Sequence, residues 1–428
     1  MELSFWAATD VGRKREVNED NFLVDKKLSL FVVADGMGGH ASGEVASHLA
    51  VHEFRNVVDA GKDVIEKYAK GDPSVRPQDV LSLLEGAIQA AGHAIYHKGQ
   101  AEPEKRGMGT TTSALLIVGD RGFIAHVGDS RIYMLRGGQV VQLTEDHSLV
   151  NELIRRGRIT REGLDGSPYK AYKNAVTRAV GVYETVQGDT IDFEILPGDQ
   201  FLLCSDGLHA YLNDQRITDF LKVEDITELP KNLVDHANTS GGHDNITAIV
   251  VRVESQQAGL IEERAEELTL KVDMLKRMPF FRHLIYKEIL RVVNVTKVRE
   301  YAAGEELLKE GTSGDEMFVL LRGKIRLHKN NAFITYLLPG AHIGEMALVD
   351  PRQPRSASAT AEERSRVLSL RRRDFYEIIR KEPQLSVKLL WSFVQVLADR
   401  LRKTTADLSG ARLEANALDM TNDVLFDD

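Results

Sequence analysis

Residues Leu30–His40 read L-F-V-V-A-D-G-M-G-G-H, an apolar run of strand length that stops at Asp35 and Gly36. A short run of branched and aromatic residues predicts a buried strand, which here carries a carboxylate to its carboxyl-terminal tip. Gly36 has no Cβ, so other atoms can approach its backbone closely. The pattern returns at Phe201–Leu208, F-L-L-C-S-D-G-L. Two buried strands that each end in Asp-Gly predict one acidic site assembled between them.

Length and composition limit the possible classes of protein. A chain of 428 residues is too long for one ordinary core and predicts two or three domains. An apolar content of 43% and a charged content of 28% are typical of a soluble globular protein, and a net charge of −9 argues against a general nucleic-acid binder. No apolar run approaches about 18 residues, and the start M-E-L-S-F-W is unlike a signal peptide. We therefore expect a cytoplasmic protein in which the lone Cys204 is a buried, inert thiol.

Residues 1–254 alternate short apolar runs with helix-like segments. Strands are predicted at Phe5–Ala8, Leu30–Ala34, Thr112–Val118, Phe123–Val127, Ile132–Leu135, Gln139–Leu143, Thr190–Ile195, Phe201–Cys204 and Ile246–Val253. Helices are predicted near Gly43–Val58, Pro77–His97, Ser148–Arg156 and Pro230–Asn238. Several strands follow one another through tight turns, which favours stacked antiparallel sheets with helices outside over a βαβ alternation.

Acidic residues follow these strands at their ends and turns. They are Glu19 and Asp20, Asp35, Asp129, Asp206 and Asp244, with Arg15 four residues before Glu19. A single Asp-Gly is more often a turn than a ligand, but turn chemistry does not easily explain five acidic elements beside strands. Two carboxylates about 4 Å apart repel by ~4 kcal/mol at an effective dielectric constant of 20, so such a cluster needs cations or protons. Oxygen ligands without His or Cys favour magnesium, manganese or calcium over zinc.

Two such ions about 3.5–4 Å apart can activate a water for in-line attack on a phosphorus atom. An arginine nearby can bind the phosphate oxygens. The ordered motifs R-E-V-N-E-D, V-V-A-D-G-M-G-G-H, G-T-T, G-D-S-R, L-L-C-S-D-G-L and G-G-H-D-N-I-T span the whole first domain. Together they resemble the bacterial metal-dependent (type 2C, PPM) protein serine/threonine phosphatases. The resemblance implies an α+β fold, a β-sandwich flanked by helices, with two manganese or magnesium ions between the sheets.

The resemblance also implies a role for each acidic residue. By this resemblance Asp35 bridges both ions, the Gly36 carbonyl completes one shell, Glu19 binds the same ion directly or through water, and Asp20 lies behind these ligands. Asp206 and Asp244 hold the other ion, and Asp129 with Asp206 forms a third metal site. Arg15 binds the substrate phosphate, so the expected catalytic residues are Arg15, Asp35 and Asp206.

One position departs from the eukaryotic members of this family. Many of them place a histidine after the Asp-Gly as a proposed general acid, whereas this chain has Met37, as many bacterial relatives do. Protonation of the leaving group then has to come from solvent at the metal site or from His40, which we do not favour. His147–Gly181 matches the flap region of the family, which is expected to help choose substrates.

Residues 255–278 predict a helical connector. Ile261, Ala265, Leu268, Val272 and Leu275 recur at steps of four and three residues, an apolar seam about two heptads long. A short coiled coil and a single amphipathic helix packed on one domain both explain this seam. Either helix is stiff and can transmit movement.

Short strands and regularly spaced glycines return in residues 279–408. Strands are predicted at Val295–Arg299, Met317–Leu321, Lys324–His328, Ile334–Leu338 and Val367–Leu370. This pattern predicts a small antiparallel β-barrel or jelly roll. Between its strands, His342–Thr360 offers bare backbone amides, one carboxylate at Glu345 and, ten residues later, Arg355. Amides and an arginine suit a phosphodiester, and a carboxylate suits ribose hydroxyls.

This stretch closely resembles the phosphate-binding cassette of cyclic nucleotide-binding domains. The resemblance implies that Glu345 binds the ribose 2′-hydroxyl and that Arg355 binds the cyclic phosphate with the Gly344–Ala347 amides. The residues expected to bind nucleotide are Gly344, Glu345, Met346, Ala347, Arg355, Ser356, Thr404 and Thr405. Ser356 is typical of the catabolite-activator branch, which dimerises through a long C-terminal helix that touches adenine.

Leu390, Val394, Leu397, Leu401, Thr404 and Leu408 follow the same steps of four and three and predict that helix. Thr404 and Thr405 fall where those relatives place hydroxyls against the base, which favours cyclic AMP over cyclic GMP; helix-capping or solvated threonines are the alternative explanation. Residues 409–428 form an acidic tail too short for a DNA-binding domain.

The sequence therefore favours a homodimeric phosphoserine/phosphothreonine phosphatase that acts on phosphorylated proteins and is regulated by cyclic AMP. An alternative is an inactive phosphatase fold that serves as a nucleotide sensor or scaffold. The intact acidic set favours the enzyme. The substrate, the choice between manganese and magnesium, and the sign of regulation stay open.

Overall fold

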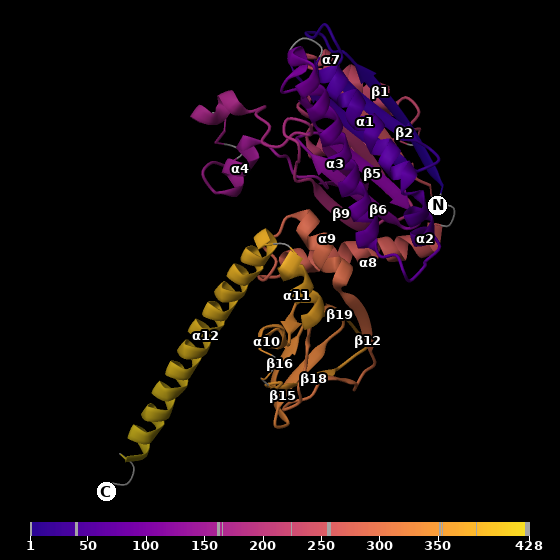
Figure 1. Cartoon of the computed structure of the whole chain (residues 1–428). Helices are drawn as coiled ribbons and strands as arrows, with labels where there is room; N and C mark the ends of the chain where they lie inside the picture. The colour runs from indigo at the N-terminus through magenta and orange to yellow at the C-terminus, as the bar shows by residue number, and fades with distance from the viewer. Residues whose placement is uncertain are drawn as a thin grey trace. The chain divides into compact units, whose positions relative to one another are not determined.

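The computed structural model describes residues 2–38, 42–160, 163–164, 166–223, 225–254, 258–350, 352, 354–381 and 383–423. The chain forms two compact units, Met1–Glu267 and Leu268–Asp428 (Figure 1). Among the described helices, none combines the length and hydropathy that crossing a membrane requires.

Two antiparallel sheets form the centre of the first unit. One has the strand order β1 (Leu3–Asp10), β11 (Ile246–Val253), β10 (Gln200–Cys204), β7 (Arg131–Arg136) and β8 (Gln139–Gln142). The other has the order β2 (Asp20–Asp25), β3 (Leu30–Met37), β5 (Thr112–Val118), β6 (Arg121–Val127) and β9 (Asp189–Glu194), with β4 (Gly109–Thr110) paired to β3. The predicted stacked antiparallel sheets are confirmed.

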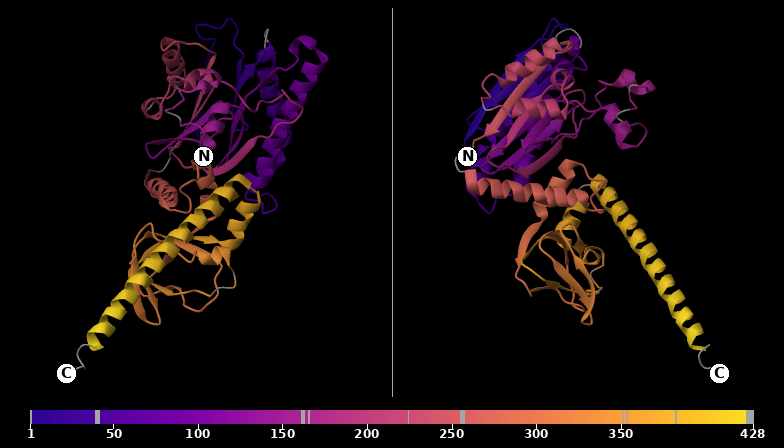
Figure 2. Two further views of the ribbon diagram at one scale, coloured as in Figure 1. Left: turned by 90° about the vertical axis from the view of Figure 1, so that its left-hand side faces the viewer. Right: turned by 180° about the vertical axis from the view of Figure 1, so that it is seen from behind.

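Helices cover the outer face of each sheet (Figure 2). The β2–β9 sheet packs against α1 (Ser42–Ala60) and α3 (Pro77–Ala101), with α2 (Lys62–Ala69) between them in the chain. The other sheet packs against α5 (Asp206–His209), α6 (Asp214–Leu221) and α7 (Leu229–Thr239). Strand β3 shows why its sequence is apolar without alternation. Val32 faces the helices, while the Phe31 ring lies 5.4 Å from that of Phe5 in the opposite sheet, so both faces of the strand are buried.

Strand β3 runs farther than the sequence predicts. Asp35 is not at its tip, because Gly36 and Met37 continue the ladder opposite β4. On the other side Asp35 lies directly opposite Asp20 of β2. The carboxylate is thus held inside the sheet, where its backbone is fixed on both sides.

The remaining elements of the first unit are short. They are η1 (Pro103–Lys105), α4 (Leu149–Arg155) and η2 (Pro168–Tyr172). Helix α4 begins at an N-cap, since the Ser148 side chain accepts a hydrogen bond from the Asn151 N–H. The β7–β8 hairpin turns through Gly137 and Gly138, whose φ angles of 54° and 78° are those of a two-residue turn that favours glycine.

The second unit contains two four-stranded antiparallel sheets. One has the order β12 (Lys297–Tyr301), β19 (Ser365–Arg371), β14 (Glu316–Arg322) and β17 (His342–Ile343). The other has the order β13 (Glu306–Leu308), β18 (Ser358–Ala361), β15 (Ile325–Lys329) and β16 (Ala332–Leu337). The sheet-rich domain is confirmed, and its described strands form two sheets rather than a closed barrel.

The helices of the second unit are α9 (Tyr286–Val295), α10 (Met346–Val349), α11 (Arg372–Lys381) and α12 (Pro383–Asp423), preceded by α8 (Ala258–Arg277). In α8, Leu268, Val272 and Leu275 are buried. Leu275 lines a small space with Phe281 and other core residues of this unit, which supports the amphipathic-helix interpretation of the connector.

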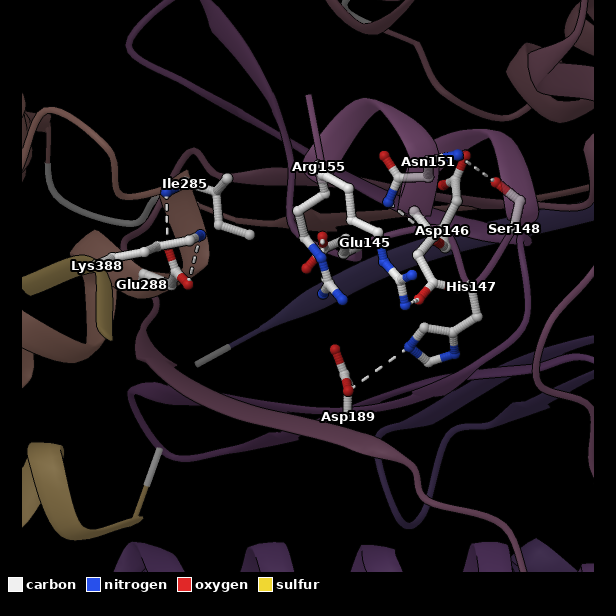
Figure 3. A network of polar contacts seen from close by, with 12 residues as sticks. Glu145, Asp146, His147, Ser148, Asn151, Arg155, Asp189, Ile285, Glu288 and Lys388 are labelled. Atoms are coloured by element: carbon white, nitrogen blue, oxygen red, sulfur yellow. Dashed lines mark hydrogen bonds and ion pairs between the residues drawn. The ribbon is translucent and has the colours of Figure 1, made fainter. Parts of the chain in front are cut away.

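The first half of α12 is fixed by aromatic and ionic contacts. The Phe393 ring lies 4.4 Å from that of Phe280 and 5.6 Å from that of Phe375. Lys388 Nζ donates to both oxygens of the buried Glu288, each at 2.9 Å (Figure 3). Helix α12 extends to Asp423 and so includes most of the segment expected to be an acidic tail.

Candidate metal centre

Five carboxylates from separate segments meet at one end of the two sheets of the first unit. Asp20 begins β2, Asp35 lies in β3, and Asp206 begins α5 directly after β10. Asp129 occupies the turn between β6 and β7, and Asp244 precedes β11. Burial raises the pKa of Asp35 well above its ordinary value, and the charges of the other four carboxylates raise this pKa further.

The same environment acts on the neighbouring acids. Burial raises the pKa of Asp20 to about 7 and that of Asp129 to about 7, with the charge of Asp206 contributing to both. Burial also raises the pKa of Asp206 and of Glu19, and a hydrogen bond joins Asp206 to Asp35. These carboxylates therefore favour a bound cation, or protons in its place.

The side chains fit divalent metal ions. Asp20 Oδ1 and Asp206 Oδ1 are buried and have no hydrogen-bond partner in the described part of the chain. All donors are oxygens, which suits magnesium or manganese. Among the described residues, no three acidic, histidine or cysteine side chains already form a ready-made metal cluster. One reason is that Arg15 Nη2 bonds Asp244 Oδ2 at 2.8 Å, which directs one carboxylate toward the guanidinium.

Hydroxyl residues hold the carboxylate of Asp20 and the backbone of Asp35. Asp20 Oδ2 accepts hydrogen bonds from Ser205 Oγ and Thr247 Oγ1, both at 2.6 Å. Thr111 Oγ1 accepts from the Asp35 N–H at 2.9 Å, and the Thr111 N–H donates to the Asp35 carbonyl at 2.8 Å. In the sequence these hydroxyl residues stand inside the acidic motifs and carry no separate signal of this role, except at two positions that could have indicated it. Ser205 directly precedes Asp206-Gly207, and Thr247 follows Asp244-Asn245 with one residue between them.

Close backbone packing positions Glu19. The Gly43 N–H at the start of α1 donates to Glu19 Oε1 at 3.2 Å. A Cβ at Gly36 would lie 2.1 Å from the Gly43 carbonyl oxygen, so helix α1 approaches β3 only because Gly36 has no side chain. Asn245 accepts from the Glu19 N–H at 2.8 Å and donates to the carbonyls of Val11 and Val17, which orders the loop that carries Arg15.

His147 ties the flap to the turn that carries Asp129. The Gly128 N–H donates to His147 Nδ1 at 3.1 Å, and the His147 N–H donates to the Gly128 carbonyl at 2.7 Å. The Thr177 N–H, near the other end of the flap, donates to the His147 carbonyl at 2.7 Å. Asp189 Oδ1 lies 3.6 Å from His147 Nε2. Both ends of the flap therefore converge on one histidine beside the acidic site, a role that the sequence did not reveal.

The predicted nucleotide residues lie mostly together in the second unit. Glu345 is buried before α10, and Gly344 has a φ of 78°. Arg355 donates to the Glu316 carbonyl at 2.7 Å and to the Gly344 carbonyl at 3.3 Å. A Cβ at Gly314 would lie 2.2 Å from the Arg355 guanidinium. The guanidinium of Arg355 therefore fits here only because Gly314 has no side chain. Burial lowers the pKa of Arg355.

The other nucleotide candidates are less enclosed. Ala347 is buried, its N–H donating to the Gly344 carbonyl, whereas Met346 and Ser356 are exposed. Thr404 and Thr405 are exposed on α12, where Thr405 Oγ1 donates to the Leu401 carbonyl at 2.8 Å. The structure thus brings together the loop residues but leaves both threonines exposed. His40, considered as a general acid, lies outside the described residues.

Residues 10–246 match the family model of protein phosphatase 2C. The chain belongs to this family. Residues 298–382 match the model of the cyclic nucleotide-binding domain, so both predicted resemblances are confirmed. The serine/threonine phosphatase stp of Listeria innocua is 38% identical over 255 residues, which are 59% of this chain and 96% of the relative. The serine/threonine protein phosphatase PstP of Mycobacterium tuberculosis is 36% identical over 253 residues, again 59% of this chain but only 45% of the relative.

Solved structures of bacterial serine/threonine phosphatases also match this chain. The catalytic domain of PstP in complex with two manganese ions is 35% identical, covers 59% of this chain and 99% of its own, and superposes with a TM-score of 0.50. Stp1 of Staphylococcus aureus is 31% identical, covers 60% and 96% respectively, and has a TM-score of 0.52. The first unit is thus a member of a family of metal-dependent serine/threonine phosphatases.

Proposed function

We propose that this protein is a cytoplasmic phosphatase that hydrolyses phosphoserine and phosphothreonine in proteins with a dinuclear centre of manganese or magnesium. One observation carries the proposal. Carboxylates from five separate segments share a buried site in which Asp20 Oδ1 and Asp206 Oδ1 have no partner among the described residues, and Arg15 lies at its edge. Membership of the phosphatase family supports it.

The residue roles that we propose follow from the motifs. Asp35 would hold both ions, Glu19 and the Gly36 carbonyl would hold one of them, and Asp206 with Asp244 would hold the other. Asp20 acts from behind through its hydroxyl contacts, and Asp129 serves a third ion with Asp206. The bound ions would supply electrophilic activation of the phosphoryl group and of the attacking water.

Arg15 has the freedom that a phosphate clamp needs. Its side chain is 49% exposed and is held by one bond to Asp244. With a cation held by Asp244, the guanidinium would be free to bind two phosphoryl oxygens in its planar fork. The arginine thus orients the phosphate ester of the substrate, while Asp35 and Asp206 would hold the metal ions on the other side of the phosphoryl group.

The enzyme proposal is tested with purified protein, manganese and a phosphothreonine peptide. We expect metal-dependent release of phosphate that Asp35→Asn and Asp206→Asn reduce by at least about 10²-fold, because each removes a charge aimed at the reacting centre. Asp72→Asn, at a surface site far from the motifs, is the matched control and keeps the activity. Absence of turnover in the wild type with either metal, in a protein whose circular dichroism shows the fold, overturns the proposal and supports the sensor alternative.

We also propose that cyclic AMP binds the second unit and regulates the phosphatase. The charge of Glu345 acts on Arg355, Glu345 directly precedes α10, and Arg355 donates to the carbonyl of Gly344. Isothermal titration should show heat with cyclic AMP that exceeds that with cyclic GMP. Arg355→Ala should abolish it, and Arg352→Ala, whose side chain is 89% exposed, should not. A coupling of about 1–3 kcal/mol would change phosphatase activity about 5- to 150-fold.

A homodimer through α12 is the third part of the proposal. The inner face of this helix carries the buried Leu385, Leu389, Phe393 and Val396. A second apolar stripe on the outer face consists of Val387, Leu390, Trp391, Val394 and Leu401, all more than half exposed. A helix with two apolar stripes, one of them open, supports pairing with a second copy.

A further inference from the structure

A cleft of about 450 Å³ connects the acidic site of the first unit to the flap. Asp129, Asp206 and Asp244 line one side. The other side is formed by flap residues from α4 and from the segment around η2, the part that stands out from the sheets in Figure 1. Under the proposed function the phosphoryl group lies at the carboxylates, so a neighbouring part of the phosphopeptide has to occupy this cleft.

The flap side of the cleft has an apolar patch. Val150 and Ile154 lie four residues apart on α4 and therefore on one face of the helix, and Leu164 joins them. Val150 is buried, whereas Ile154 and Leu164 are only partly covered. Covering the last two with an apolar side chain of a substrate would remove more of their surface from water.

A cation and an amide lie beside this patch. Lys173 and Asn174 are exposed and line the cleft, and neither side chain makes a hydrogen bond or ion pair with the described residues. Among the described residues that line the cleft, Arg131 is the other Lys or Arg side chain, but Arg131 bonds both oxygens of Asp146, at 2.9 and 2.6 Å. Lys173 is therefore the cation available to a ligand in a cleft whose opposite side is acidic.

We propose that this cleft is a specificity subsite for the residues next to the phosphorylated one. An apolar side chain of the substrate packs on Ile154 and Leu164, an acidic residue beyond it pairs with Lys173, and Asn174 bonds the peptide backbone. The inference depends on the proposed phosphatase function, to which it adds the class of substrate: phosphoproteins with an apolar residue and then an acidic residue beside the phosphoserine or phosphothreonine. The cleft is continuous with the carboxylates, so both ends are occupied by one peptide.

The first test compares phosphothreonine peptides that differ only in Leu or Ser next to the phosphoresidue, on either side of it. We expect kcat/KM to favour Leu by about tenfold on one side, within the range for small apolar groups in a pocket. Ile154→Ser with Leu164→Ser should bring the ratio close to one. The ratio is measured within each preparation, so a general loss of activity cancels. Tyr172→Ala, a 54% exposed aromatic on the same flap that does not line the cleft, should keep the ratio.

The second test exchanges charge. Peptides with Asp or Lys beyond the apolar residue should differ in kcat/KM in favour of Asp, and Lys173→Glu should invert the preference. Raising the salt concentration should reduce both effects, since the pair is exposed. Unchanged preferences in Lys173→Glu overturn the acidic part of the subsite, and a Leu/Ser ratio of one in the wild type overturns the apolar part.

The outcome for the subsite is separate from that for the enzyme. Hydrolysis of p-nitrophenyl phosphate, which has no flanking residues, reports the phosphatase alone. If the protein hydrolyses this ester but shows no preference among the peptides, the subsite is rejected and the proposed phosphatase activity stands. Fluorescence anisotropy of labelled phosphopeptides reports the same preferences without turnover, so absence of hydrolysis rejects the proposed function while the binding ratios still decide the inference.

Discussion

Asp20 has two oxygens in different environments. Oδ2 accepts two hydroxyl hydrogen bonds, and Oδ1 is buried without a partner among the described residues. A carboxylate with one oxygen satisfied by the protein and one left over is suited to act on a neighbouring ion or its water. The raised pKa of Asp20 is the energetic cost of holding it there.

The first prediction concerns pH. The pKa of Asp20 is about 7 in the folded chain and about 3.9 when unfolded, so the folded state binds more protons between these values. Without divalent ions, stability should therefore fall as the pH rises from about 4 to about 7, by an amount on the order of 2 kcal/mol. Calorimetry of the chelated protein measures this fall.

Excess manganese should flatten that dependence, because the cation replaces the protons. Asp20→Asn should weaken it in chelator, since it removes one titrating carboxylate, while the raised pKa of Asp129 and of its neighbours keeps part of the dependence. A chelated wild type that becomes more stable from pH 5 to pH 7 would contradict the prediction.

The second prediction concerns His147. His147→Ala leaves the buried Gly128 N–H without an acceptor, a loss of about 1–3 kcal/mol, and loosens the turn that carries Asp129. We expect kcat/KM for a phosphopeptide to fall about tenfold. His147→Asn, whose Oδ1 can take the place of Nδ1, should recover most of it, which a merely space-filling role would not explain. His52→Ala, at an exposed histidine, is the control.

At the scale of elements, the apolar strands and helices were predictable, including the short β8 and α4, whereas β2 and α10 were not. The predicted Thr112–Val118 strand and the helix near Pro77–His97 agree with β5 and α3, because burial on one or both faces dictates their residue pattern. Strand β2 was missed, since its sequence D-N-F-L-V-D begins and ends on acids whose place depends on partners in other segments. Helix α10, four residues long, is likewise set by its surroundings.

The third prediction concerns the crossing of α1 and β3. Gly36→Ala places a Cβ 2.1 Å from the Gly43 carbonyl, so α1 must move and Glu19 loses its backbone donor. We expect a loss of about 1–3 kcal/mol and of metal-dependent activity. Gly86→Ala, in α3 with nothing within 4 Å, should stabilise by about 0.5–1 kcal/mol. Thermal unfolding separates the two, and equal effects would contradict the argument.

At the scale of the whole molecule, the open stripe of α12 predicts the association state. Val394→Glu with Leu401→Glu puts two charges on it, so sedimentation should show half the mass of the wild type. Asp399→Ala, on the same exposed length of helix, should leave the dimer intact. A monomeric wild type at micromolar concentration would contradict the dimer.

The sequence alone determined the two domain families, the antiparallel sheets and the identity of the acidic set, because ordered motifs and apolar runs are local properties of the chain. Tertiary structure decided which groups hold these acids. Ser205 and Thr247 reach Asp20 across about 200 residues of sequence, and His147 joins both ends of the flap to the Asp129 turn. It also decided that Lys173 and Ile154 face the same cleft as Asp206. Such contacts depend on how sheets and helices pack, and no local pattern of residues records that packing.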